Sequence, residues 1–268
     1  MTFLLGADPE LFIKNRKTGN FVSAESKRRV LIPGTKANPH EVDGGAIQVD
    51  GVAAEFNINP AANFQSFFGN IRKVVTNLDE RIKAVNKDYA LSPVPTATFN
   101  KRYFDDLPEH TKMLGCEPDF DAYTDGSENP RPSTDEPFRT GSGHIHIGWT
   151  TGADPKYEGH ILDCCMVTKE LDRYLHHASK TWDDDTKRME LYGRPGSFRP
   201  KPYGMEYRPL SNRWIKDQDT IRDVYLITMG VIRSLDSGRH SFEIPNYYRT
   251  TCPRRQVLYF LSEFTYDL

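Results

Sequence analysis

Four segments of the chain alternate hydrophobic and polar residues, a pattern typical of strands that bury one face and expose the other. They are residues 4–13, 52–58, 141–148 and 203–210. Each carries two polar or charged side chains two positions apart, so both members of a pair share one face of the strand. The pairs are Asp8 and Glu10, Glu55 and Asn57, His144 and His146, and Glu206 and Arg208. In one antiparallel sheet covered by helices on its other side, the four pairs would converge on one open polar face.

Apolar residues at helical spacing predict helices between and after these strands. The first predicted helix follows Asn59, a good N-terminal cap, and Pro60, a favourable first helical residue. Its apolar stripe continues to residue 85. A short helix is expected after the acidic residues 183–185, which suit the positive end of a helix better than a metal. The other predicted helices span residues 156–179, 219–235 and 254–263.

Turn and loop residues leave several functional questions open. Asp50-Gly51 is the turn expected between strands 46–49 and 52–58, so Asp50 is assigned to the turn. Pro9 cannot donate a ladder hydrogen bond, which indicates an edge strand or a bulge. Lys36 could reach a phosphate or could be an ordinary solvated loop lysine. Two acids within residues 116–119 lie among turn residues, which favours a plain loop. Short strands are expected at residues 96–99 and within residues 115–122.

Length and composition are those of one globular domain covering residues 1–268. The net charge of −2 provides no basic field for nucleic acid or an acidic membrane. No apolar run approaches the roughly 20 residues of a membrane span. The four cysteines, at positions 116, 164, 165 and 252, contain no C-x-x-C pair. We therefore expect reduced thiols and a cytoplasmic protein.

The polar face would hold acids, histidines and arginines together. Crowded carboxylates repel one another and raise one another's pKa, and a divalent cation relieves that repulsion. Oxygen ligands with some imidazole suit Mg²⁺ or Mn²⁺. Arg208 and the nearby Arg199 could supply forked donors for a phosphoryl group. A solvated sheet face with ordinary salt bridges is the alternative, and repetition in four strands favours the metal–phosphate site.

In their order along the chain, these motifs resemble those of the phage-encoded carboxylate–amine ligases of the glutamine synthetase-like superfamily, which also includes glutamate–cysteine ligases. The resemblance runs from GADPE at residues 6–10 to EYRPLSN at residues 206–212. It implies that His146 contacts nucleotide phosphate and that Arg199 and Arg208 lie near the transferred phosphoryl group. The metal ligands that it implies are Asp8, Glu10, Glu55, His144 and Glu206.

The resemblance also implies a fold and an activity. The expected fold is an α+β, glutamine synthetase-like catalytic domain, with a curved, mainly antiparallel sheet backed by helices and an open polar active-site face. The expected activity is an ATP- and Mg²⁺-dependent (or Mn²⁺-dependent) ligase that joins a carboxylate to an amine through an acyl phosphate. Its substrates would be small molecules or peptides, with no nucleic-acid or membrane partner. An oligomer is left open, and a phage-encoded enzyme would act in the cytoplasm of the infected bacterium.

Two other functions remain open at this point. A metal-dependent hydrolase, oxygenase or zinc amidohydrolase could use His144, His146 and a carboxylate. A cupin would place a glutamate three or four residues beyond its H-x-H pair, where this chain has residues 149–151 (WTT). A non-catalytic phage accessory protein could retain the fold, although intact polar pairs in all four strands disfavour it.

Overall fold

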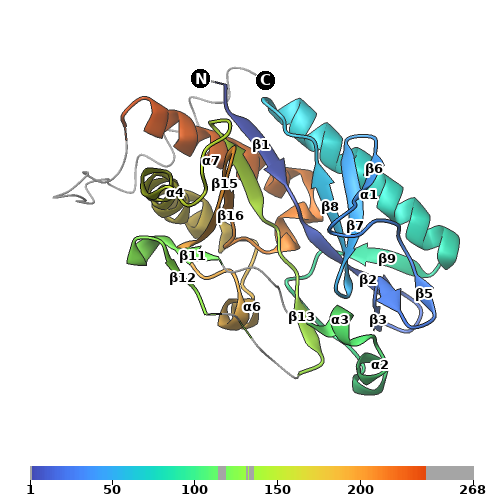
Figure 1. Cartoon of the computed structure of the whole chain (residues 1–268). Helices are drawn as coiled ribbons and strands as arrows, with labels where there is room; N and C mark the ends of the chain where they lie inside the picture. The colour runs from blue at the N-terminus through green and yellow to red at the C-terminus, as the bar shows by residue number, and fades with distance from the viewer. Residues whose placement is uncertain (1, 114–118, 131, 133–135, 240–268) are drawn as a thin grey trace.

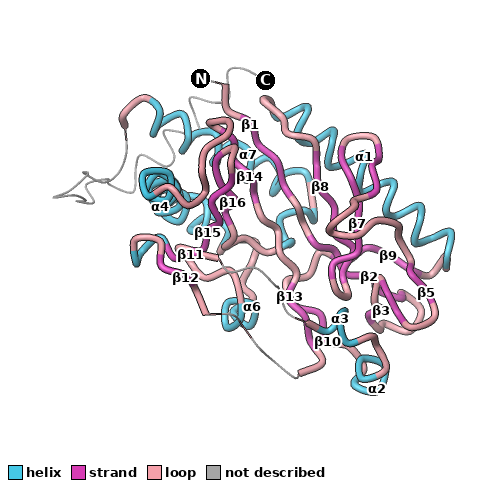
Figure 2. Tube along the Cα trace, viewed as in Figure 1, coloured by secondary structure: helices cyan, strands magenta, loops and turns pink. Residues whose placement is uncertain are grey.

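The computed structural model describes residues 2–113, 119–130, 132 and 136–239, and it is an α+β structure with antiparallel sheets (Figures 1 and 2). The first large sheet has the strand order β1 (Leu4–Ala7), β14 (Ile145–Gly148), β16 (Gly204–Tyr207), β15 (Ser197–Lys201), β11 (Phe120–Asp121), β12 (Ser127–Glu128). The second has the order β3 (Phe21–Val22), β2 (Glu10–Asn15), β8 (Ala53–Ile58), β7 (Gly45–Asp50), β6 (His40–Val42), and β9 (Tyr89–Ser92) also pairs with β2. Two small two-stranded sheets are β10 (Thr96–Thr98) with β13 (Phe138–Thr140), and β4 (Glu25–Ser26) with β5 (Arg29–Val30).

The two large sheets meet at Asp8 and Pro9. The single strand predicted over residues 4–13 is wrong, because the chain leaves one sheet as β1 and enters the other as β2. Pro9 has no N–H to donate, so a continuous ladder cannot pass through it. The backbone N–H of Asp8 still donates to His144 at 3.3 Å, and that of Glu10 to Ser142 at 2.8 Å. One sheet curls into a half-barrel.

Three long helices cover the strands (Figure 1). Helix α1 (Phe64–Val85) packs on β7, β8 and β9 and buries the predicted stripe, including Phe67, Ile71 and Leu78. Helix α4 (Glu158–Leu171) packs on β15 and β16. Helix α7 (Gln218–Asp236) packs on both other helices. Hydrophobic burial between this layer and the strands forms the core, so the polar groups of the strands lie on the opposite side.

Shorter helices complete the described part of the chain. Helix α4 continues through a π-helical turn, Asp172–His176, into α5 (His177–Ser179), so the helix expected over residues 156–179 is confirmed apart from this irregularity. Asp185 caps α6 (Thr186–Leu191) by accepting from the backbone N–H groups of residues 187 and 188. The remaining short helices of the described residues are α2 (Lys101–Asp105), α3 (Glu109–Lys112) and the 3-10 helices Ala122–Thr124 and Asn212–Lys216. The helix expected over residues 254–263 lies outside the described residues.

Two local predictions are corrected by the structure. Asp50 pairs with Ala53, so the loop of the β7–β8 hairpin is Gly51-Val52, and Asp50 belongs to the strand. Gly51 takes a φ of 56°, a conformation that glycine adopts without strain. Helix α1 begins at Phe64, because Asn63 rather than Asn59 accepts the capping hydrogen bond from the Ser66 N–H at 2.8 Å. Among the described residues, no helix combines the length and apolarity that crossing a membrane requires.

Candidate metal and phosphate site

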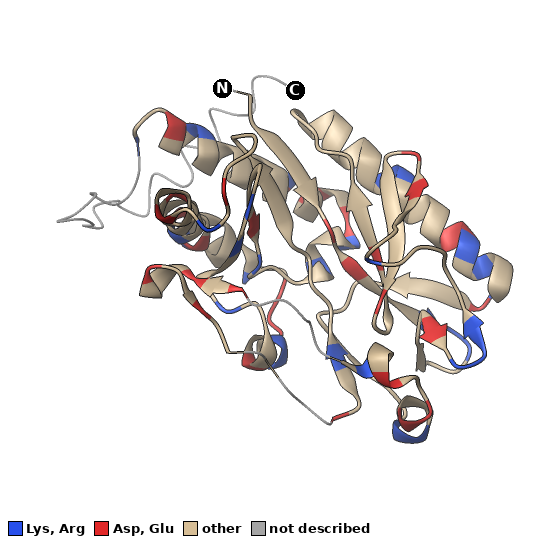
Figure 3. Ribbon diagram, in the orientation of Figure 1, with Lys and Arg blue, Asp and Glu red and all other residues tan. Residues whose placement is uncertain are grey.

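All nine residues predicted for the site line a single cavity of about 380 Å³. They come from the β1–β2 junction, β8, β14, β15, β16 and the loop before β6. These residues are Asp8, Glu10, Lys36, Glu55, His144, His146, Arg199, Glu206 and Arg208. Charged residues of both signs therefore gather on the strands in the middle of the molecule as well as on the outer surface of the helices (Figure 3).

Strand alternation explains why these side chains meet. On β14, Ile145 and Ile147 are buried in the core, while His146 lines the cavity. On β16, Met205 and Tyr207 are likewise buried beneath the sheet. Glu206 is the register partner of His146 on one side and of Arg199 on the other. The side chains of register partners lie on the same face, so the three groups come together.

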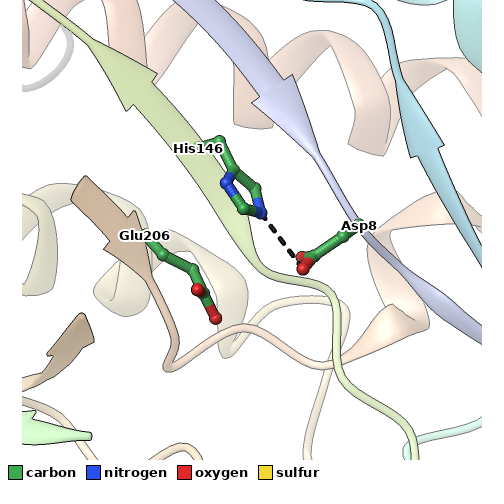
Figure 4. A group of neighbouring side chains, drawn as sticks. All are labelled: Asp8, His146 and Glu206. Atoms are coloured by element: carbon green, nitrogen blue, oxygen red, sulfur yellow. Dashed lines mark ion pairs between the residues drawn. The ribbon is translucent and has the colours of Figure 1, made fainter. Parts of the chain in front are cut away.

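One cluster, which we call the histidine cluster, consists of Asp8, His144, His146 and Glu206. His146 Nε2 lies 3.1 Å from Asp8 Oδ2 (Figure 4). His144 Nδ1 lies 3.4 Å from Asp8 Oδ1 and 3.2 Å from Glu206 Oε1. Asp8, His146 and Glu206 each offer one ligand atom, and these atoms all lie within 4.8 Å of one another. A metal could therefore be held here, but the imidazoles already contact both carboxylates.

Cations surround Glu206, whose side chain is almost fully buried. Its carboxylate lies 3.1 Å from Arg199 Nη1 and 3.2 Å from Lys201 Nζ, and it also accepts from Arg208 Nη1. Burial raises the pKa of Glu206, but Arg208 and the other neighbouring positive charges outweigh it and hold that pKa well below its usual range. Glu206 is therefore ionised and charge-compensated without any added cation.

The pKa values of the two histidines are shifted in opposite directions. Burial and the charge of Arg208 lower the pKa of His144 to about 4, so its ring is neutral near pH 7. Burial also lowers the pKa of His146, but Asp8 and Glu206 more than offset it, and the pKa of His146 is raised. The pKa of Asp8 is lowered, because the two histidines outweigh the effect of its burial. Nδ1 of His146 also hydrogen-bonds the Tyr203 hydroxyl.

A second cluster, which we call the carboxylate cluster, consists of Glu10, Asp50 and Glu55. One oxygen from each lies within 4.8 Å of the others, and Glu10 and Glu55 are register partners. Lys36 Nζ lies 3.6 Å from Asp50, and the Ser142 N–H donates to Glu10 at 3.1 Å. Within the described part of the chain, the buried Oε2 of Glu55 has no hydrogen-bond partner. These three acids thus have much less compensation than Glu206.

The pKa values of the carboxylate cluster reflect this imbalance. Burial and the charge of Asp50 raise the pKa of Glu10 to about 7. Burial, together with Asp8, Asp50 and Glu10, raises the pKa of Glu55 well above its usual range. The cluster must therefore hold protons or a cation. Its ligands are oxygen atoms, which suit a hard divalent cation such as Mg²⁺ or Mn²⁺.

Sequence reasoning missed several residues at this cavity. Asp50 was assigned to a turn. It lies two positions after Gln48 on the same strand, so the two side chains share one face, and both line the cavity. Asp119 was assigned to a plain loop, but its Oδ2 accepts from Arg208 Nε at 3.0 Å. Tyr192 and Arg139 also line the cavity, and no local pattern marks them. Glu117, the other acid of that loop, lies outside the described residues.

No protein-family model matches the sequence, and no curated protein shows a significant match to it. The function must therefore be argued from the cavity itself.

Proposed function

We propose that this protein is an ATP- and Mg²⁺-dependent ligase that joins a carboxylate to an amine, built on a glutamine synthetase-like catalytic domain. The observation that carries the proposal is the pairing of the two clusters in one cavity. The carboxylate cluster lacks a sufficient positive charge, whereas Arg199, Lys201 and Arg208 line the same cavity around Glu206. A cation site beside arginines suits a metal-bound phosphate chain. The order of motifs along the chain supports the same function.

The fit of Mg²⁺ can be judged from the protein atoms. The orphaned Oε2 of Glu55 is a buried acceptor that a cation would satisfy, and Glu10 and Asp50 supply further oxygen ligands. Asp8, His144 and Glu206 would hold a second ion only by giving up some of their present contacts. Bound Mg²⁺ would neutralise phosphate oxygens and so assist the departure of ADP.

In the proposed reaction, an oxygen of the substrate carboxylate attacks the γ-phosphorus of ATP, and the bond to ADP breaks. The amine nitrogen then attacks the acyl carbon, the carbon–oxygen bond to phosphate breaks, and the nitrogen releases a proton to solvent. Arg199 and Arg208 would bind the phosphoryl oxygens, with His146 and Lys36 as further donors to nucleotide phosphate. Such catalysis consists mainly of positioning and charge stabilisation.

One observation favours a second candidate, a zinc-dependent hydrolase. Asp8, His146 and Glu206 form a compact group with imidazole and carboxylate donors, which zinc accepts. Three cations already engage Glu206, however, and they would oppose a further cation at this carboxylate. We therefore rank this candidate second.

The test compares Glu55→Gln with Glu41→Gln, a control on the exposed strand β6. Mg²⁺ should raise the melting temperature of wild type and of the control but not of Glu55→Gln. Without metal, Glu55→Gln and Glu10→Gln should be as stable as wild type or more stable, because a repelling charge is removed. Turnover in both variants should fall by about a hundredfold or more, on the scale of about 3 kcal/mol.

Turnover is measured as ADP release in a broad screen of carboxylate and amine pairs, alongside calorimetry with ATP and metal analysis. The proposal requires Mg²⁺-dependent ATP binding and ADP release that needs both substrates. Stoichiometric zinc together with no ATP binding would favour the hydrolase. Absence of both metal and nucleotide binding would identify a non-catalytic protein.

A further inference from the structure

A groove of about 220 Å³ opens where helices α4 and α7 pack against each other, beside the start of β1 (Figure 1). The apolar residues that line it are Phe3, Trp149, Met166, Val167, Ile232 and Leu235. Three of these, Trp149, Met166 and Leu235, are only partly buried by the described residues. A contiguous apolar surface that stays partly exposed indicates a place where another segment or molecule binds.

The apolar surface continues along α4, and its rim is acidic. Leu162 is 42% exposed and lies four residues before Met166, on the same side of the helix. Asp163 and Asp236 also line the groove, and both are exposed. A segment that fits this groove should therefore be apolar along one face and positively charged at one end.

The chain itself carries such a segment close to the groove. Helix α7 ends at Asp236, on the rim, and the described part of the chain ends at residue 239. Residues 240–268 therefore continue from the edge of the groove, and they include the helix predicted over residues 254–263. A segment attached at the rim can reach the groove without a second molecule.

The predicted helix has the apolar stripe and the charge that the groove requires. Val257, Leu261 and Phe264 recur at spacings of four and three residues, so a helix would place them on one face. Arg254 lies three residues before Val257, on the same side as this stripe, and Arg255 follows it. The stripe matches the apolar lining of the groove, and the two arginines match the two acids of its rim.

The connecting residues are long enough for this placement. Residues 240–253 span up to about 50 Å when fully extended, and the predicted helix would be about 15 Å long. A tethered segment also binds at a high effective concentration, in the millimolar range for short flexible linkers. A groove of about 220 Å³ holds only a few side chains, which is small for the roughly 1,200 Å² that a stable interface between two molecules buries. The chain's own segment is therefore favoured over a second copy.

We propose that residues 254–264 bind as an amphipathic helix in the groove between α4 and α7 of the same chain. Val257, Leu261 and Phe264 then pack on the apolar lining, and the arginines that precede them lie beside the acids of the rim. This inference does not depend on the proposed ligase activity, because within the described residues the groove and the central cavity are lined by different side chains.

The test measures amide hydrogen exchange of the full chain by mass spectrometry. A helix of about ten residues is marginal in water by itself, so slow exchange within residues 257–264 would report docking rather than local helix formation. Leu261→Glu places a charge on the apolar stripe and should speed exchange in this segment by about tenfold or more. Ser262→Glu lies outside the stripe and is the matched control, which should exchange as slowly as wild type.

A second set of variants tests the groove itself. Asp163→Lys combined with Asp236→Lys reverses the charge of the rim at two exposed positions and should also speed exchange within residues 257–264. Adding Arg254→Asp and Arg255→Asp should restore slow exchange, because opposite charges again face each other.

The control for the rim variants is Glu41→Lys combined with Glu80→Lys, two exposed acids on β6 and α1. It makes the same change in net charge away from the groove and should leave exchange unchanged. Fast exchange within residues 257–264 of wild type, or equal exchange in wild type and Leu261→Glu, would overturn the proposal. Slow exchange that the rim variants do not alter would place the segment elsewhere. Slow exchange that appears only as the protein dimerises in sedimentation experiments would assign the groove to a second copy.

Discussion

The Tyr207 hydroxyl donates a hydrogen bond of 2.7 Å to Oδ1 of Asp172, on the helix-covered side of β16. The other oxygen of Asp172 accepts from the Gly196 N–H at 2.6 Å, just before β15 begins. Tyr207 lies between Glu206 and Arg208 in the sequence. The buried carboxylate of Asp172, in the π-helical turn after α4, therefore contacts β16 and the start of β15, the strand that carries Arg199 and Lys201. The packing of the helical layer and the geometry of the site are connected at this point.

Asp172 should make stability depend on pH in a defined window. Burial raises its pKa from 3.8 to about 6, against its hydrogen bonds from Tyr207 and Gly196. The folded state therefore binds this proton more tightly than the unfolded state does, and stability should fall as pH rises from about 4 to about 6. Relative to Asp172→Asn, the unfolding free energy of wild type should fall by at most about 3 kcal/mol across that pH window. Urea unfolding at several pH values measures the difference.

The control for this experiment is Asp236→Asn, an exposed acid at the end of α7. The difference in unfolding free energy between Asp236→Asn and wild type should not change over the same pH range. A flat difference for Asp172→Asn as well would mean that Asp172 titrates normally.

Removing the charge of Glu206 should have the opposite effect on stability from removing that of Glu55. Glu206→Gln leaves Arg199, Lys201 and Arg208 without their shared carboxylate in a buried setting. Breaking such a buried pair costs about 3–5 kcal/mol, so this variant should unfold at clearly lower urea concentration than wild type in metal-free buffer. Equal stabilities for Glu206→Gln and Glu55→Gln would contradict the assignment of one compensated and one uncompensated cluster.

His146 and Ile147 are neighbours that face opposite sides of β14, which allows function and packing to be separated. Ile147 is 1% exposed and lies in the core, so Ile147→Ala should lose about 2–5 kcal/mol of stability while nucleotide affinity stays near normal in the folded protein. His146→Ala should weaken nucleotide binding and lose roughly 1 kcal/mol of stability, the scale of its hydrogen bonds. Denaturant midpoints and ATP calorimetry test both. The reverse pairing of effects would mean that the cavity is not the active face.

The start of α1 provides a test of local structure. Asn63→Ala removes the side-chain oxygen that accepts from the Ser66 N–H and should cost about 1 kcal/mol of stability. Asn59→Ala should leave stability nearly unchanged, because the side chain of Asn59 is exposed and its contact with Asn70 uses the backbone carbonyl. Thermal unfolding of the two variants compares them. A larger loss for Asn59→Ala would restore the cap predicted from the sequence.

The sequence by itself determined the elements whose pattern is local. The apolar stripe of α1 and the alternation around His146 and Glu206 are fixed by residues three to four or two positions apart. Hydrophobic burial follows such periodicity directly, so the buried face of each element and the polar face of the strands could be predicted. The nine candidate residues, which line one cavity, were predicted in this way, with help from a family resemblance, because almost all of them are polar residues on or beside those strands.

Only the tertiary structure decided which of these side chains meet. Asp8 and Glu10 were expected as one pair on one strand face, but Pro9 sends them to different clusters. The position of Asp50 depended on strand pairing with Ala53, which overrides the local preference for a turn at Asp50-Gly51. Arg139 and Tyr192 approach the cavity from elements that carry no recognisable pattern. The convergence of these groups and the electrostatic environment of each one depend on long-range packing and burial, which periodicity along the chain does not encode.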